Sequence, residues 1–305
     1  MMYDVIIIGS GPAGLTASIY TSRARLTTLL IAGIEWGGQL MLTTDVENYP
    51  GFKDGIQGPD LMSEMWKQTE RFGTEVVFND ATAIDFSSRP FNISVGTTMY
   101  TGQAVIVATG STARWLGLES ETRLRGRGVS ICATCDAAFF QDMVVVVVGG
   151  GDSAMEEALA LSNFAREVKV VPRRDTLRAS EILQERVFNN PKIEFFWNST
   201  VQDILGQDKV DGIRLQSTDT DEERELACDA VFVAIGRFPN TTIFRGELAF
   251  DEKDYIVVRD ETKTSVEGVF AAGDVQDQCY RQAVTAAGEG CRAALDAQRF
   301  FEKVT

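Results

Sequence analysis

Residues 4–14 read Asp-Val-Ile-Ile-Ile-Gly-Ser-Gly-Pro-Ala-Gly, and this stretch decides the fold. Its apolar first half predicts a strand that runs into a glycine turn, and residues 15–25 predict a helix after it. In a dinucleotide-binding unit the first glycine permits the tight turn, the second lets the backbone approach a diphosphate, and the third lets the helix pack on the strand. Gly9, Gly11 and Gly14 have this spacing. The alternative is a glycine-rich turn without a ligand, but the strand and helix around it favour a nucleotide site.

A second copy of the unit begins with five consecutive valines at residues 144–148. Such a run is typical of a central parallel strand buried on both faces. It enters the turn Gly149-Gly150-Gly151-Asp152-Ser153-Ala154, and residues 155–164 predict a helix. The copies share a later strand, because residues 104–110 resemble residues 230–236. We therefore predict the α/β class with two Rossmann-like dinucleotide-binding domains.

The length of 305 residues also suggests about two domains. The chain becomes polar at residues 111–117 and 237–246, which we interpret as crossings between domains. The tail, residues 247–305, predicts a strand and turn at 268–274 and an amphipathic helix at 282–301. A segment of about 60 residues is a poor independent domain, so the tail should complete one of the two halves.

Composition excludes several classes of function. With 44 acidic and 29 basic residues the formal net charge is −15, which argues against a nucleic-acid or anionic-membrane surface. No apolar run approaches the ~20 residues that cross a bilayer, and the start lacks a basic signal-peptide region, so we expect a soluble cytoplasmic protein. Histidine is absent, which removes His-dependent triads and His-metal sites.

Just before the second glycine turn, residues 132–136 read Cys-Ala-Thr-Cys-Asp. A C-x-x-C pair near a dinucleotide fold, in a chain without a secretory signal, indicates a redox dithiol. Half of a zinc site is the alternative, but it needs four ligands, and we expect no metal. The other cysteines are single and widely spaced, and we interpret them as buried small apolar residues: Cys228, Cys279 and Cys291.

Two nucleotide sites beside a dithiol suggest electron transfer. One dinucleotide would donate a hydride, and a flavin would pass the two electrons on to sulfur. Asp136 follows Cys135 directly and is placed to exchange a proton with a thiolate. The alternative is that Asp136 caps a helix or turn.

Together these motifs resemble the low-molecular-weight thioredoxin reductases, which are FAD-dependent pyridine nucleotide-disulfide oxidoreductases. The resemblance covers essentially the whole chain. The matching segments are Ile8–Gly14, Gly37–Leu40, Val46–Phe52, Cys132–Asp136, Gly149–Ala154, Gly273-Asp274 and Tyr280–Ala283.

The resemblance implies a split FAD-binding domain, residues 1–112 and 242–305, with an NADPH-binding domain that carries the dithiol inserted at 113–241. Electrons would pass from NADPH through FAD to the Cys132–Cys135 disulfide, and on to thioredoxin or a thioredoxin-like protein. In this family Cys135 would be the sulfur next to the flavin, Cys132 the one that exchanges with substrate, and Asp136 the acid. The inserted domain would rotate at its two crossings, and the enzyme would be a homodimer.

Further binding residues follow from the motifs and the resemblance. Glu35, just past the second strand, is the acidic residue nearest to the position at which a ribose is read. For FAD we expect Gly9, Gly11, Pro12, Gly14, Glu35, Gly38, Gln39, Asn48, Thr109, Gly110, Gly273, Asp274, Arg281, Gln282 and Ala283. For NADPH we expect Gly149, Gly151, Ser153, Ala154, Arg173, Arg174 and Arg178.

The arginines suit a 2′-phosphate, because a planar guanidinium pairs bidentately with phosphate. They lie near the ribose-reading position, about 20 residues after the second glycine turn. The family usually has Val-His-Arg-Arg here, whereas this chain has Val-Pro-Arg-Arg at residues 171–174. Pro172 could redirect the arginines, and a solvated basic turn is the alternative, but we predict NADPH rather than NADH.

Other functions remain open at this stage. The same fold serves dithiol oxidases that pass electrons to oxygen, and reductases that are fed by ferredoxin or that serve another redox carrier. A redox-sensing flavoprotein without catalysis is a third possibility, which the Cys-Ala-Thr-Cys-Asp set argues against. Four residues that flank the dithiol could face a protein substrate, or could instead be core and solvated residues: Arg125, Arg127, Phe139 and Phe140.

Overall fold

The computed structural model describes residues 2–304, with side chains described as far as residue 302. The chain forms two compact units, residues 1–112 with 238–305, and residues 113–237. The second crossing lies at 237/238, whereas the sequence placed it at 241/242. The reason is that strand β18 (Arg237–Pro239) pairs with β9 (Ser111–Ala113), so both crossings occur within paired strands rather than in the polar segment that follows.

The first unit has a seven-stranded sheet. Its path runs β5 (Glu75–Val77), β2 (Thr28–Ile31), β1 (Met2–Ile8), β8 (Thr98–Val107), β7 (Phe91–Val95) and β6 (Ala81–Asp85), and β19 (Val269–Ala271) also pairs with β8. Along this path β5, β2, β1 and β8 are parallel to one another, and β19 is parallel to β8. Strand β7 is antiparallel to β8, and β6 is antiparallel to β7.

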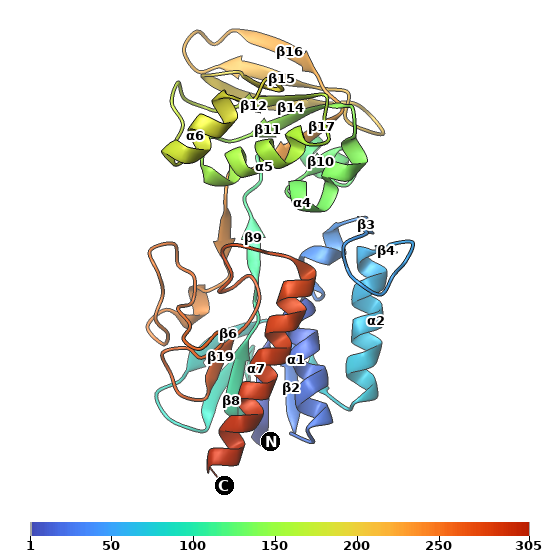
Figure 1. Cartoon of the computed structure of the whole chain (residues 1–305). Coiled ribbons are helices and arrows are strands. Elements are labelled where there is room, and N and C mark those ends of the chain that lie inside the picture. The colour runs from blue at the N-terminus through green and yellow to red at the C-terminus, as the bar shows by residue number, and fades with distance from the viewer. Residues whose placement is uncertain (1, 305) are drawn as a thin grey trace. The chain divides into compact units, whose positions relative to one another are not determined.

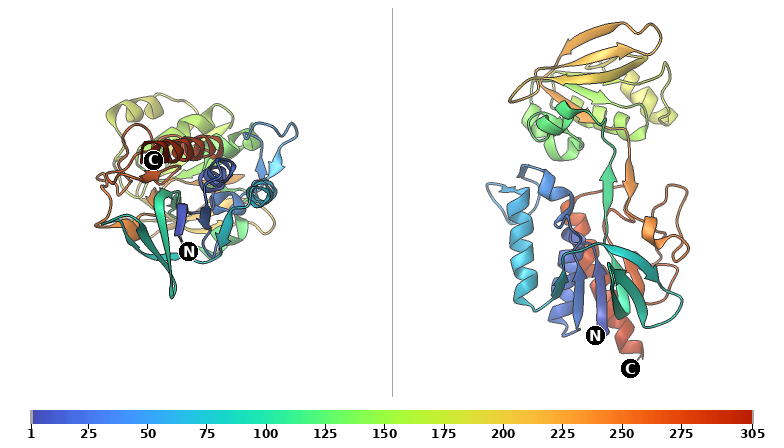
Figure 2. Two further views of the ribbon diagram at one scale, coloured as in Figure 1. Left: turned by 90° about the horizontal axis from the view of Figure 1, so that it is seen from below. Right: turned by 180° about the vertical axis from the view of Figure 1, so that it is seen from behind.

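Helices α1 (Pro12–Arg23), α2 (Gly58–Arg71) and α7 (Ala283–Val304) cover one face of this sheet (Figures 1 and 2). Alternate residues of β1 explain the packing, because Val5 and Ile7 face these helices while Ile6 and Ile8 face the segment 244–275. Helix α7 lies so close to α1 that a Cβ on Gly290 would be 2.1 Å from the Ala13 carbonyl oxygen. The tail therefore completes the first unit, through β19 and α7.

The second unit has a parallel sheet in the order β10 (Val129–Ser130), β17 (Ala230–Val233), β11 (Val144–Val148), β12 (Glu167–Val171) and β13 (Ile193–Phe195). In the valine strand β11, Val145 and Val147 pack towards helix α5 (Asp152–Ser162). Val146 and Val148 pack towards an antiparallel sheet of β14 (Ser199–Leu205), β15 (Gly212–Ser217) and β16 (Glu223–Ala227). The prediction of a central strand buried on both faces is confirmed.

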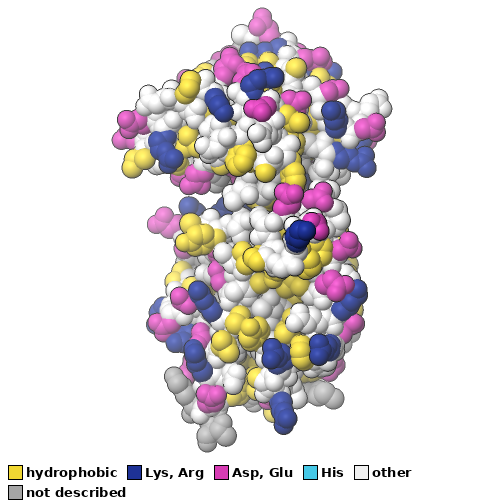
Figure 3. Space-filling model, turned by 45° about the vertical axis from the view of Figure 1, so that its right-hand side comes forward, with side chains coloured by type: hydrophobic (Ala, Val, Ile, Leu, Met, Phe, Trp, Pro, Cys, Tyr) yellow, Lys and Arg dark blue, Asp and Glu magenta, His cyan; other side chains and the backbone are white. Residues whose placement is uncertain are grey.

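The remaining elements are short. They are helices α3 (Glu119–Leu124), α4 (Ala133–Asp136) and α6 (Glu181–Phe188), strands β3 (Asp45–Val46) and β4 (Ile56–Gln57), and the 3-10 turns η1 (Gly38–Leu42), η2 (Ala137–Phe140) and η3 (Thr242–Phe244). Within residues 2–304 no helix is long and apolar enough to span a membrane. On the face drawn in Figure 3, acidic and basic side chains are interspersed over both units.

Candidate redox and nucleotide sites

The first glycine turn is shaped by close backbone approach. A Cβ on Gly9 would lie 2.3 Å from the Ala108 carbonyl oxygen, and a Cβ on Gly14 would lie 1.8 Å from the carbonyl oxygen of Gly9. A Cβ on Gly11 would instead meet no atom within 4 Å. Gly11 is the N-cap of α1 and makes no side-chain cap, and Pro12 opens the helix. The space beside Gly11 at this helix start is therefore open, which leaves room for a diphosphate.

Two other predicted segments meet this turn. A Cβ on Gly38 would lie 3.4 Å from the Gly11 Cα, and a Cβ on Gly273 would lie 3.0 Å from the Ala13 Cβ. Gln39 follows Gly38 in η1 and is half-buried. The structure thus brings Gly38 and Gly273 to the start of α1, although they are far apart in the sequence.

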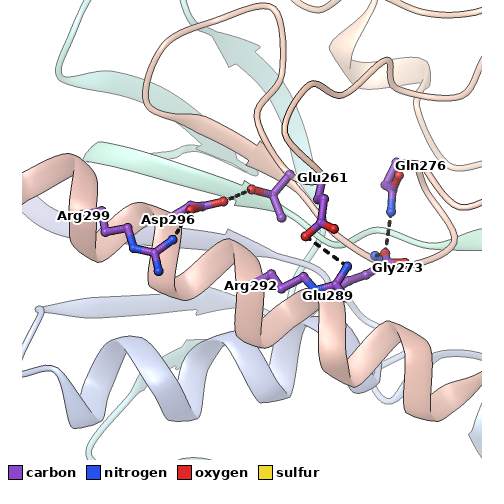
Figure 4. A network of polar contacts seen from close by, with 8 residues as sticks. Glu261, Gly273, Gln276, Glu289, Arg292, Asp296 and Arg299 are labelled. Carbon is purple, nitrogen blue, oxygen red and sulfur yellow. Dashed lines mark hydrogen bonds and ion pairs between the residues drawn. The ribbon is translucent and has the colours of Figure 1, made fainter.

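Asp274 is placed by its neighbours on both sides. Its carboxylate accepts the Ser111 hydroxyl at 3.2 Å. The preceding Gly273 donates its amide to Glu289 of α7 at 2.6 Å, within the polar network drawn in Figure 4. Gln276 also donates to Glu289, so α7 holds the loop that carries Asp274. In the same network Arg292 of α7 pairs with Glu261, and Arg299 pairs with Asp296 within α7.

The segment before α7 forms a second cluster. The Asn48 side-chain amide donates to Gln282 Oε1 at 3.2 Å. Arg281 has a φ of 50°, donates to the Tyr255 hydroxyl at 3.3 Å, and has a buried Nε with no acceptor. Ala283 begins α7. The Gln282 side-chain amide in turn donates to the Tyr280 and Arg281 carbonyls, so this segment is held by its own hydrogen bonds.

Thr109 and Gly110 are held by one residue. The Thr109 hydroxyl donates to the Asn240 carbonyl at 2.8 Å, and the Asn240 amide donates to the Gly110 carbonyl at 2.9 Å. Glu35 lies apart from this arrangement. It is exposed in the loop after β2, and none of the hydrogen bonds and ion pairs of the described residues joins it to the glycine turn.

The second glycine turn repeats the first. A Cβ on Gly149 would lie 2.4 Å from the Ala234 carbonyl oxygen, whereas a Cβ on Gly151 would meet no atom within 4 Å. Gly151 is the uncapped N-cap of α5. Ser153 and the fully buried Ala154 lie in the first turn of α5. The open helix start fits a second dinucleotide.

One of the three predicted arginines, Arg178, is tied to this turn by a hydrogen bond. Strand β12 ends at Val171, so Pro172 stands just outside the ladder, where a missing N–H costs no strand pairing. Arg173 and Arg174 are exposed. The Arg178 amide donates to the Gly150 carbonyl at 2.7 Å, which brings exposed Arg178 beside the glycine turn. None of the three forms an ion pair with a residue that the structure describes.

The cysteine pair lies at the start of α4. Cys132 and Cys135 form a disulfide with their Cα atoms 5.3 Å apart, and the Cys135 amide donates to Cys132 Sγ at 3.2 Å. Cys135 is exposed and Cys132 is half-buried. A disulfide at the surface is open to thiol exchange.

Asp136 has a partly buried carboxyl that accepts the Ser130 hydroxyl. Burial raises the pKa of Asp136, and the Ser130 hydrogen bond partly offsets this rise. The Ser130 oxygen also accepts the Cys132 amide at 3.1 Å. The Asp136 side chain makes no capping bond, which argues against the alternative role as a cap.

Sequence reasoning missed two residues here. Ser130 could have been found from its place two residues before Cys132. Glu157 gave no such signal, because it reaches the cysteine turn from α5, where its carboxylate accepts the Ala133 amide at 2.6 Å. Burial raises the pKa of Glu157 to about 7, against the lowering effects of the Ala133 amide and Arg237.

The other cysteines differ from one another. Cys228 is buried, and burial raises its pKa to about 12. Cys279 is exposed and Cys291 is partly exposed, so the prediction that all three are buried is wrong. Both lie in the tail, and the sequence around a single cysteine does not show whether its side chain is buried. In the described part of the chain no group of Cys, Asp and Glu could hold a metal ion.

The residues flanking the dithiol have mixed roles. Phe139 is 40% exposed, whereas Phe140 packs its ring on Phe232 at 5.6 Å. Arg127 is exposed, whereas Arg125 lies over the Trp115 ring at 3.8 Å. Only Phe139 and Arg127 are therefore available to a partner.

Comparison with known proteins agrees with this geometry. The family described as pyridine nucleotide-disulphide oxidoreductase matches residues 3–290. The chain belongs to that family of oxidoreductases.

Among its relatives, a thioredoxin reductase of Rickettsia conorii is 53% identical, with 98% of each chain covered. One of Streptomyces clavuligerus is 54% identical over 98% of this chain and 94% of its own. The crystal structure of thioredoxin reductase from Streptococcus pyogenes superposes with a TM-score of 0.95 at 41% identity, over 99% of each chain. Within the family the chain groups with the thioredoxin reductases, which use FAD and NADPH.

Proposed function

We propose that the first unit binds FAD, that the second binds NADPH, and that Cys132 and Cys135 are the redox pair that reduces a thioredoxin. The observation that carries this proposal is the repeated helix start, open at Gly11 and at Gly151, in a chain whose second unit also holds an exposed disulfide. The relatives named thioredoxin reductase support the partner.

Gly9, Gly11, Pro12, Gly14 and Gly38 would hold the FAD diphosphate, with Asp274 towards the ribityl chain. Asn48, Arg281, Gln282 and Ala283 would lie at the flavin ring. Gly149, Gly151, Ser153 and Ala154 would hold the NADPH diphosphate, and Arg173, Arg174 and Arg178 its 2′-phosphate. When bound, the two cofactors supply two electrons to the disulfide.

The protein's own residues would handle the protons and the exchange. Reduction of the Cys132–Cys135 bond takes two electrons and two protons and yields two thiols. Asp136 would hold a proton for the Cys135 sulfur, because its burial favours the neutral acid at higher pH. The Cys132 thiolate would then attack the partner's disulfide, and Cys135 would displace the partner from the mixed disulfide, which restores the Cys132–Cys135 bond.

The dithiol and the residues proposed for FAD belong to different units, so electron transfer requires that the two meet. We propose a rotation at the crossings 112/113 and 237/238, because only two chain segments join the units. We also propose a homodimer, as in the resembled family, in the cytoplasm, where NADPH is available. Size-exclusion chromatography with light scattering tests the dimer.

The deciding experiment measures NADPH oxidation by the purified flavoprotein in the presence of oxidised thioredoxin. We expect turnover, and we expect Cys135→Ser to abolish it while flavin reduction by NADPH continues. Flavin that NADPH does not reduce would overturn the proposal, in favour of a reductase fed by ferredoxin. Oxygen consumption with a small dithiol, in place of thioredoxin reduction, would favour a dithiol oxidase.

A further inference from the structure

Glu157 lies on α5 and reaches the first turn of the cysteine segment. Its carboxylate accepts the amide of Ala133, the residue directly after Cys132, at 2.6 Å. Ala133 is 1% exposed, and the bond is partly buried. A hydrogen bond from an amide to a carboxylate is stronger than one between neutral groups. Glu157 therefore fixes the backbone from which the Cys132 sulfur projects.

Two consecutive backbone amides of this turn are linked by hydrogen bonds to carboxyl groups. The Ala133 amide donates directly to Glu157. The Cys132 amide donates to the Ser130 hydroxyl oxygen, and that hydroxyl donates to Asp136. All of these residues lie in the second unit. The cysteine turn is thus held between a carboxyl that the proposed mechanism uses and one that it does not.

The charge of Glu157 is set by the groups around it. Burial has the largest effect and raises its pKa to about 7. The Ala133 amide and Arg237 of β18 lower the pKa, whereas Asp136 of α4 and Glu156 on the same helix raise it. Glu157 therefore changes from neutral to negative within the neutral pH range, close to the cysteine pair.

A negative charge beside a thiol disfavours the thiolate. Cys132 must lose its proton before its sulfur can attack a disulfide, so a charged Glu157 opposes this step while it holds the turn in place. We propose that Glu157 is a positioning residue for the redox pair, which fixes the Cys132 turn through Ala133 and restrains the ionisation of the Cys132 thiol. This inference rests on the proposed role of the cysteine pair.

Two substitutions separate the two effects. Glu157→Gln keeps an oxygen that can accept the Ala133 amide but removes the charge, whereas Glu157→Ala removes both. Glu185→Gln is the matched control, because Glu185 is an exposed carboxylate on α6 of the same unit. Each is made in the Cys135→Ser background of the full-length flavoprotein, so that Cys132 is the only thiol of the pair.

The measurement is the rate at which iodoacetamide alkylates Cys132, followed by peptide mass spectrometry from pH 6 to pH 9. We expect Glu157→Gln to match its parent at pH 6, where Glu157 is protonated, and to react roughly tenfold faster at pH 8. A separate assay uses enzyme with both cysteines. There we expect Glu157→Ala to lower kcat with thioredoxin roughly tenfold, and Glu157→Gln to retain most of it.

The inference would be overturned if the ratio of the Glu157→Gln alkylation rate to the parent rate did not change with pH. It would also be overturned if Glu185→Gln showed the same pH-dependent increase in alkylation rate. The proposed function fails by a different result, which is thioredoxin reduction by the Cys135→Ser enzyme with NADPH. The two failures are therefore distinguishable.

Discussion

A Cβ on Gly14 would lie 1.8 Å from the carbonyl oxygen of Gly9, within the turn that joins β1 to α1. No rotation of a side chain relieves such a clash, because the contact is with backbone. Gly11, between these two residues, has open space at its Cβ position and an extended backbone with a φ of −70°. Gly14 thus allows the helix to pack on the strand, whereas Gly11 leaves the space in which we propose that the diphosphate binds.

Gly11→Ala should therefore leave the fold intact and weaken FAD binding, because the new methyl group enters only the space proposed for the diphosphate. Gly14→Ala should lower the melting temperature even without FAD. The measurements are thermal unfolding of the apoprotein and the flavin content of the purified variants. A Gly11→Ala protein that keeps full flavin content would contradict the proposed diphosphate site.

The arginine cluster predicts the choice of electron donor. Replacing any one of the three arginines with alanine should weaken the binding of NADPH by ~1.5–3 kcal/mol, or roughly ten- to a hundredfold. The variants are Arg173→Ala, Arg174→Ala and Arg178→Ala, and each should bind NADH about as the parent does. Anaerobic stopped-flow reduction of the flavin with each nucleotide measures this. Equal loss with both nucleotides would mean that the arginines support the turn rather than read the phosphate.

Asp136→Asn should slow thioredoxin reduction by roughly 10²-fold or more while the flavin spectrum is unchanged, because the acid is lost. The raised pKa of Asp136 means that the folded state holds this proton more tightly than the unfolded state. The stabilisation from Asp136 is therefore present in acid and is lost as pH rises through its folded pKa. The free energy of unfolding, measured with urea at a series of pH values, should fall in the parent as Asp136 ionises and should not fall in this way in Asp136→Asn. Parallel pH dependences of the two proteins would contradict the raised pKa of Asp136.

We predict that Glu289 of α7 contributes to FAD binding although it lies outside the proposed FAD site. Glu289→Ala should leave the Gly273 amide and the Gln276 side chain without their shared acceptor, and so loosen the turn before Asp274. We expect FAD to bind roughly tenfold more weakly, since two part-buried hydrogen bonds to the Glu289 carboxyl are lost. Titration of apoprotein with FAD measures it. Glu302→Ala, an exposed position on the same helix, is the control and should bind FAD as the parent does.

The exposed residues beside the dithiol predict a partner effect. Arg127→Ala and Phe139→Ala should raise the Michaelis constant for thioredoxin several-fold, because both are free to contact a protein. A small disulfide reagent should be reduced at the parent rate. Equal effects on both substrates would return these residues to a structural role.

The sequence by itself determined the two nucleotide folds and the dithiol, because each depends on residues that are adjacent in the chain. The turn at Gly9–Gly14, the valine strand β11 and the Cys-x-x-Cys spacing are local patterns with one main structural solution. The expected helices start late, at 15 and 155, because the helices include the turn residues after Gly11 and Gly151. The open end of each turn is visible only in three dimensions.

Only the tertiary structure decided which distant groups meet. Asn48 and Gln282 are 234 residues apart and share a hydrogen bond, and Glu157 reaches Ala133 from another helix. The tail joined the first unit because β19 pairs with β8 and Gly290 lets α7 lie against Ala13. Burial, and with it the raised pKa values of Asp136 and Glu157, likewise depends on what the whole fold places over a residue, which no local spacing encodes.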